Sequence, residues 1–204
     1  MVRNEKLPLV LLAIVGAALI VSAIAPTDRL TWWLEALPVL IALPLMTLTA
    51  RRFPLTNLLY VLIACHALVL LLGAHYTYAK VPLGDWARDT FGLMRNPYDR
   101  LGHLVQGFVP AIIAREILLR KSVLRAGGWL FFIVSSICLA FSACFELFEW
   151  LVAVIGGGSA DQYLATQGDI WDTQWDMFCA LIGSVVAQLT LARRHDRELA
   201  RLGR

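Results

Sequence analysis

Charged residues are scarce in this sequence. Only 16% of its 204 residues are Asp, Glu, Lys or Arg, whereas 59% are hydrophobic. Soluble globular domains typically carry about 25% charged residues. The longest polar stretches, residues 76–100 and 156–174, are too short to build a hydrophobic core of their own. An ordinary soluble domain is therefore excluded, and the long apolar runs predict an all-α polytopic membrane helix bundle.

Motifs of soluble enzymes are also missing. The chain has no GxSxG, HExxH, P-loop or Rossmann glycine pattern. No run of basic and aromatic residues predicts binding to nucleic acid. The four cysteines all lie in apolar segments, which leaves no loop disulfide and indicates inert packing residues. The lipid bilayer is the expected partner, and function must be sought in the polar residues of the apolar segments.

Six apolar segments are long enough to cross a hydrocarbon core of about 30 Å. We expect them within one integral membrane domain, residues 1–204, at 7–25, 32–50, 55–74, 101–119, 128–154 and 174–192. The first follows Arg3 and Lys6 and lacks a convincing cleavage site, so we interpret it as a signal anchor.

The basic residues are sorted by side. With the N-terminus inside, 13 of the 18 Lys and Arg residues fall on the inner side, and only Arg29, Lys80, Arg88, Arg95 and Arg100 lie outside. Cytoplasmic loops are enriched in Lys and Arg, so this division predicts a membrane protein with both termini in the cytoplasm.

The fourth expected span opens with a polar stripe. Asp99, His103 and Gln106 recur at helical spacing and share one face. Asp99 is the obvious partner for an intramembrane His one turn later. Such a pair suits a proton relay or a metal ligand with its orienting carboxylate. A helix N-cap is the alternative interpretation of Asp99.

The fifth expected span has a second stripe, which runs from Ser135 through Ser142 to Glu146 and Glu149 near its outer end. Two carboxylates one turn apart in a low-dielectric site cannot both ionise freely unless a cation intervenes. Ion pairs with Arg95 or Arg100 are the structural alternative.

The sixth expected span presents Asp169, Asp172 and Asp176 on one face, followed by Gly183. Asp172 could cap this helix, but Asp176 lies about a turn inside it, where a carboxylate is costly and usually marks a site. Small residues such as Gly183 allow helices to approach closely.

Acids and histidines of several spans thus reach one depth, which predicts a polar chamber at the outer end. The candidate catalytic residues are Asp99, His103, Glu146, Glu149, Asp172 and Asp176. The candidate metal ligands are His103, Glu146, Glu149, Asp172 and Asp176. The candidate substrate-binding residues are Arg95, Arg100, His75, Tyr78, Gln106 and Asp169. Glu35 is interpreted as snorkelling to the interface, and Arg115 with Glu116 as a structural pair.

These residues carry a family resemblance. The motif Asn96-x-Tyr98-Asp99-Arg100-x-x-His103 and the long motif from Thr166 to Met177 closely resemble the YjdF family of bacterial inner-membrane proteins. That family is described as a domain of unknown function. The resemblance implies location and topology, and it leaves the chemistry open.

A more distant resemblance is to VanZ-like membrane proteins. Asp99, Arg100 and His103 fit the first element of their pattern, and Glu146 and Asp172 fit later elements. Glu149 stands where that pattern has Gln, and Asp176 where it has Asn. The chamber is therefore more acidic than the VanZ pattern implies, which favours cation binding.

Three functions fit the chamber. The first is an enzyme that processes a lipid or lipid-linked envelope substrate, with a divalent metal ion as cofactor and Arg95 and Arg100 holding an anionic head group. The second is a non-catalytic ligand-binding, assembly or resistance protein. The third is a proton-coupled transporter, which the thinning of polar residues toward the inner half disfavours.

The orientation can be tested with C-terminal fusions. We expect a fluorescent-protein fusion to be bright and an alkaline phosphatase fusion to be inactive, because the 13-to-5 division of basic residues predicts a cytoplasmic C-terminus. An active phosphatase fusion together with a dark fluorescent fusion would reverse the orientation.

Overall fold

The computed structural model describes residues 6–156 and 166–202. All regular elements in these residues are helical, which confirms the predicted class. They are α1 Lys6–Ser22, α2 Arg29–Thr49, α3 Asn57–Tyr76, η1 Tyr78–Lys80, α4 Pro82–Phe91, α5 Tyr98–Lys121, α6 Gly128–Gly156 and α8 Asp172–Leu202. Of the expected outer loop 156–174, residues 157–165 lie outside the described part.

Five of these helices, α2, α3, α5, α6 and α8, are long and apolar enough to cross a membrane. The chain is therefore a multi-pass membrane protein. Helix α1 is apolar but has only 17 residues, so a sixth span at this helix stays a prediction.

Two helical segments differ from the expected spans. Helix α8 continues to Leu202, well past the predicted end at residue 192, because the charged tail keeps helical spacing and buries His195. Helix α4 lies in a stretch that was expected to be a polar loop. Its local signals are Pro82 at its first turn and Gly92 as a left-handed C-cap with φ of +63°.

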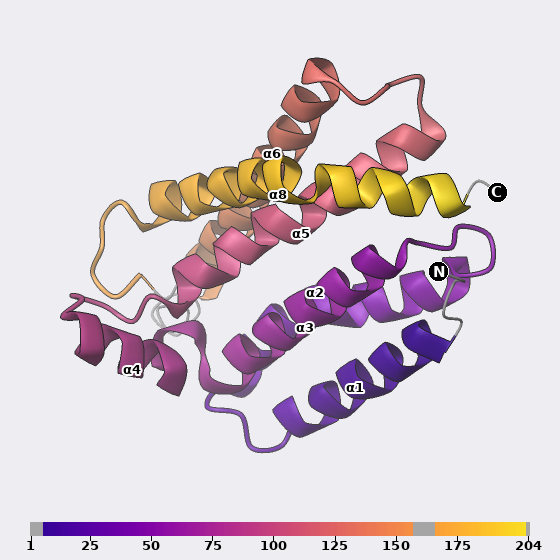
Figure 1. The fold of residues 1–204 in the computed structure, drawn as a ribbon. Coiled ribbons are helices and arrows are strands. Elements are labelled where there is room, and N and C mark those ends of the chain that lie inside the picture. Colours follow the sequence, from indigo (N-terminus) through magenta and orange to yellow (C-terminus); the bar gives the residue numbers. More distant parts are fainter. Residues whose placement is uncertain (1–5, 157–165, 203–204) are drawn as a thin grey trace.

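The helices form two groups (Figure 1). Helices α1, α2 and α3 enclose one apolar cluster, which includes Trp32, Ala36 and Leu71. Helices α3, α5, α6 and α8 enclose a second, which includes Leu59, Ile112 and Val134. Because α3 contributes to both clusters, it joins the two groups into one bundle.

Helices α5 and α8 cross at very short range near the middle of the bundle. Gly107 of α5 faces the backbone of Ala180, and Gly183 of α8 faces the backbone of Leu104, so a Cβ atom at either glycine would collide with the opposing main chain. The small residues that the sequence suggested for close approach thus hold α8 against α5.

The bundle has two polar ends. The acidic end comprises the N-terminal ends of α5 and α8 and the C-terminal ends of α3 and α6, and the basic end lies opposite. At the basic end, Glu116 is fully buried and accepts hydrogen bonds from Thr56 Oγ1 (2.8 Å) and Arg120 Nη1 (2.7 Å), and it contacts His195 Nε2 at 3.0 Å.

The expected pair between neighbours Arg115 and Glu116 does not form. Adjacent helical residues point in different directions. Arg115 instead contacts His195 Nδ1 at 2.9 Å and Asp196 at 2.7 Å. Glu198 accepts a hydrogen bond from the backbone N–H of Leu58 at the start of α3. The basic end of α8 is therefore anchored to both α3 and α5.

The α5–α8 crossing gives a stability prediction. We expect Gly107→Ala to lower the free energy of unfolding by about 1–3 kcal/mol, because the new methyl group meets the Ala180 backbone. The control is Gly16→Ala in α1, where nothing lies within 4 Å. This control should be neutral or stabilising by up to about 1 kcal/mol, since Ala has the better helix propensity. Unfolding in detergent measures both, and equal effects would contradict the close crossing.

Candidate functional site

Local structure at the start of α5 leaves Asp99 available for the interior. Asn96 Oδ1 accepts a hydrogen bond from the Tyr98 backbone N–H at 3.0 Å, and Asp99 lies inside the first turn. The N-cap position is held by Pro97, whose side chain makes no cap hydrogen bond. The alternative interpretation of Asp99 as an N-cap is therefore wrong.

Three buried side chains from two helices meet at the acidic end. Asp99 and His103 of α5 and Asp176 of α8 each bring one potential ligand atom within 4.8 Å of the others. Their exposed fractions are 7%, 5% and 2%. His103 Nε2 also lies 3.5 Å from Glu146 Oε1, which comes from α6. We call Asp99, His103, Glu146 and Asp176 the inner cluster.

The stripe on α6 faces the bundle interior, because Ser135, Cys138, Ser142, Glu146 and Glu149 are all buried.

Several polar atoms of the inner cluster lack a hydrogen-bond partner within residues 6–156 and 166–202. They are His103 Nδ1, Glu146 Oε1 and Asp176 Oδ1. Buried polar groups normally find partners, so each of these atoms needs an explanation.

A second layer of charges lies between the inner cluster and the end of the molecule. Arg95 forms an ion pair with Asp172 and lies 3.5 Å from Asp99 and 3.8 Å from Asp169. Arg100 pairs with Asp169 at 2.6 Å. Its guanidinium also stacks over Trp175, 5.4 Å from the ring centroid. We call these aspartates and arginines the outer layer.

The two arginines therefore compensate the aspartates of α8 and its preceding loop. They were expected either to hold an anionic head group or to pair with Glu146 and Glu149, and the ion pairs that are seen go to Asp residues. In the described part of the chain, no Lys or Arg forms an ion pair with Asp176. Within the inner cluster, Asp99 thus has Arg95 nearby, whereas Asp176 has no arginine or lysine partner in the described residues.

Sequence reasoning missed Glu35. Its side chain is only 5% exposed, so it does not snorkel to the interface, and it interacts electrostatically with Asp99. Glu149 interacts with Glu35, Glu146 and Asp176, so these acids form one electrostatic group. The position of Glu35 close to Trp32 in the sequence did not indicate that its side chain points into the bundle.

Tyr78 closes one wall of this group. Its ring packs against Gly73 of α3 and Gly102 of α5, where any side chain would collide with it. Burial raises the pKa of Tyr78 well above its usual range, and the nearby carboxyl groups of Glu35 and Asp99 raise it further. Tyr78 is therefore a neutral packing residue beside the acids.

The loop before α8 is clamped to the start of α5. Gln167 Oε1 accepts from the Asn96 backbone N–H, and Gln167 Nε2 donates to the Asn96 carbonyl, both at 3.0 Å. The turn needs left-handed backbone at Gln167 and Gly168, with φ of 50° and 86°. This explains the Gln-Gly pair of the motif, for which sequence reasoning had no role.

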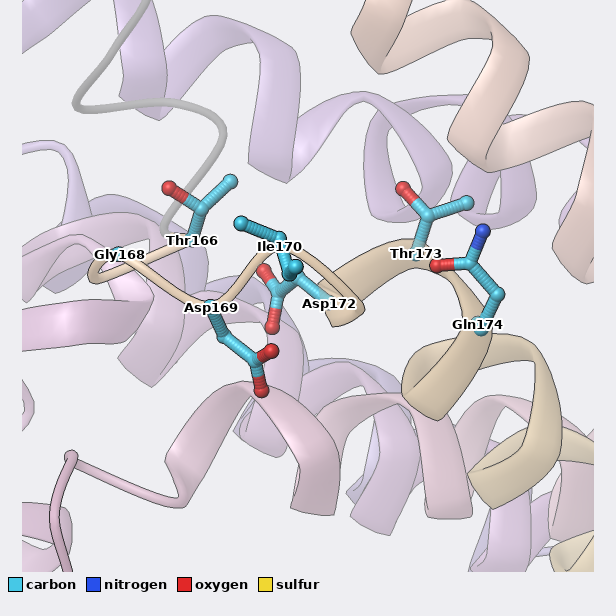
Figure 2. Close-up of a pocket in the computed structure, with 7 residues that line it drawn as sticks. All are labelled: Thr166, Gly168, Asp169, Ile170, Asp172, Thr173 and Gln174. Carbon is cyan, nitrogen blue, oxygen red and sulfur yellow. The ribbon is translucent and has the colours of Figure 1, made fainter.

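A pocket of about 460 Å³ lies on this loop (Figure 2). It is lined by Thr166, Gly168, Asp169, Ile170, Asp172, Thr173 and Gln174. Figure 2 shows that Asp169 and Asp172 come from the loop and the first turn of α8. Because Arg95 pairs with Asp172 and also lies 3.5 Å from Asp99, the pocket adjoins the inner cluster.

Two other predicted residues lie apart from the cluster or beside it. His75 Nδ1 contacts the carbonyl of Ser22 at 3.1 Å, so this histidine fastens α3 to the end of α1. Gln106 follows His103 by one turn on α5 and is half-buried.

The charge arrangement restricts the chemistry of the inner cluster. A carboxylate removed from water is costly unless it is paired, protonated or bound to a cation. Arg95 reaches Asp99, but in the described residues no Lys or Arg forms an ion pair with Asp176 or Glu146, which leaves protons or a metal ion to balance these two acids. Two carboxylates and an imidazole are ligands that Mn²⁺ and Zn²⁺ accept.

The family described as "Predicted membrane protein (DUF2238)" matches residues 7–197 of this chain. The chain belongs to this family. It is also 52% identical to the inner membrane protein YjdF of Escherichia coli strain K12 over 185 residues, which cover 91% of this chain and 88% of that protein. No solved structure matches. The chain is thus a multi-pass inner-membrane protein, and neither similarity assigns a reaction.

Removing the central cation of the outer layer should be costly. We expect Arg95→Gln to lower the free energy of unfolding by about 3–5 kcal/mol, because it leaves buried carboxylates without their partner. Adding Asp172→Asn should restore part of the loss. Arg88→Gln is the control and should change little, because its pairs with Asp85 and Asp89 lie on the surface. A neutral Arg95→Gln would mean that the aspartates are already protonated.

Proposed function

We propose that this family member is a membrane enzyme that binds a divalent metal ion through Asp99, His103 and Asp176. Its substrate is a lipid or lipid-linked molecule of the cell envelope. One observation carries the proposal: three buried side chains bring their ligand atoms within 4.8 Å of one another, and Asp176 has no arginine or lysine partner in the described part of the chain.

The ligand set favours a metal that takes oxygen and nitrogen together. Carboxylates alone suit Mg²⁺, Ca²⁺ or Mn²⁺, whereas the imidazole of His103 also admits Zn²⁺. Three protein ligands leave a position for water or substrate, as catalytic metal sites require. Asp176 Oδ1, which is buried and has no hydrogen-bond partner in the described residues, supports a ligand at this place.

The reaction class that fits is hydrolysis of an ester or phosphate ester. A metal ion at the inner cluster would lower the pKa of a bound water and polarise the substrate oxygen. Glu146, 3.5 Å from His103, is the candidate base that takes the water proton and returns it to the leaving oxygen as its bond breaks. The pocket beside Asp172 offers room for a head group.

Non-catalytic binding is the second candidate, and one observation favours it. Arg95 and Arg100 are engaged with Asp172 and Asp169, so they do not offer a ready site for an anionic head group. In that case the chamber holds a cation or a partner without chemistry. Proton-coupled transport has less support, because Glu116 and His195 fill the basic end with mutual contacts.

The site is proposed to face the periplasm. The acidic end carries few basic residues, and the basic end includes Arg120, Lys121 and the arginines near the end of α8. A periplasmic position would give the pocket access to lipids and lipid-linked molecules of the outer leaflet.

Metal analysis tests the proposal directly. We expect protein purified without chelators to contain about one divalent ion per chain, and EDTA to lower its unfolding temperature. Asp176→Asn should weaken metal binding roughly 10-fold or more, because it removes a ligand charge. Asp89→Asn makes the same change on the exposed surface of α4 and should retain the metal.

The lipid profile of a deletion strain separates the two candidates. Enzyme function predicts that a lipid species accumulates and that wild-type protein, but not Asp176→Asn, restores the profile. Bound metal with an unchanged profile would favour non-catalytic binding. Absence of metal, together with indifference of the unfolding temperature to EDTA and divalent ions, would leave shared protons as the means of balancing the inner cluster.

A further inference from the structure

Helix α4 has its apolar side turned away from the protein. At 3.6 residues per turn, Leu83, Trp86 and Thr90 share one side, and Phe91 borders it at the last residue of the helix. Asp85 and Arg88 lie on the opposite side. The exposed fractions of Leu83, Trp86 and Phe91 are 55%, 59% and 68%. A helix on the surface of a soluble protein would bury such a side against its own core.

The polar side of α4 is the one that contacts the protein. Asn96 Nδ2 donates to the Val81 carbonyl at 3.0 Å and to Asp85 Oδ1 at 3.1 Å. Gly84 lies so close to Asn96 that any side chain there would collide with it. These contacts hold the helix in one orientation, so the exposure of its aromatic residues is fixed by the fold.

The position of α4 limits what can cover its apolar side. Ten residues extend only about 15 Å, half of a hydrocarbon core, so α4 cannot cross the membrane. It connects the end of α3 at Tyr76 with the start of α5 at Tyr98, and both are membrane-spanning helices. Figure 1 shows α4 beside the start of α5 at this end of the bundle.

We propose that α4 is an interfacial helix that lies flat in the membrane leaflet at the acidic end, with Leu83, Trp86 and Phe91 inserted among the lipids. Amphipathic helices with Trp and Phe on one side and charges on the other occupy such positions. The charged side has two acids and one arginine, so insertion does not require anionic lipids.

This placement would set the depth of the candidate site. Met94, fully exposed, is followed directly by Arg95 of the outer layer and by Asn96, which clamps Gln167. The pocket before α8 would therefore open at the level of the lipid head groups. The proposal itself does not rest on metal binding or on catalysis.

Spin labels on neighbouring residues of α4 test the insertion. Thr90 lies on the apolar side and Asp89 on the charged side, and both are exposed. We place Thr90→Cys or Asp89→Cys in a variant whose four native cysteines are replaced, and reconstitute it in phosphatidylcholine liposomes. A label at residue 90 should collide more often with oxygen, which dissolves in lipid, than with a water-soluble nickel complex. The label at residue 89 should show the reverse.

Two outcomes would overturn the proposal. Equal access of the nickel complex to both labels would mean that the apolar side faces water. Loss of access to both reagents at residue 90, with spin–spin broadening that disappears on dilution with unlabelled protein, would mean that a second copy covers it. Leu83→Cys, two turns before residue 90 on the same side and exposed, provides a second label and must agree with residue 90.

Discussion

The acidic end of this protein is governed by the cost of keeping carboxylates out of water. Arg95 and Arg100 meet that cost for the aspartates at 169 and 172. They do not extend to Asp176, whose Oδ1 has no hydrogen-bond partner in the described part of the chain. The arrangement is therefore asymmetric: Arg95 and Arg100 balance the outer aspartates and approach Asp99, and Asp176 lies beyond them. An exchangeable cation or proton fits such an interior better than a permanent one.

Hydrophobic patterning predicted most of the fold. Apart from the end of α8, the apolar runs and the basic residues that follow them placed the long helices within a few residues of their observed bounds. The sequence did not predict the extension of α8, because the residue that His195 contacts is distant in the sequence. His195 of α8 is buried against Glu116 of α5. Helix α4 was not predicted, because it has only ten residues and three of them are charged. Such a short polar segment resembles a loop unless its residues are sorted by helix side.

The sequence predicted which helix faces carry the acids of the candidate site. It did not predict which of these acids contact one another. Helical spacing correctly turned Glu146 and Glu149 toward the interior. Which acids meet depends on where α5 and α8 cross, and that point is fixed by Gly107 and Gly183. This is why Asp99, rather than Asp172, groups with His103 and Asp176. Glu35 depends on the packing of α2 against the bundle, about which its own helix carries no signal.

The unbroken length of α8 has a mechanical consequence. From Asp172 to Leu202 it is a rod of about 45 Å, anchored at the basic end by His195 and gripped midway at Gly183. A helix held at two points can neither slide nor tilt freely. The distance between the carboxylates of Asp176 and Asp99 is therefore fixed by the packing of α8 against α5. At the proposed metal site, selection among ions of different radius would then follow from the separation of the two anchored helices.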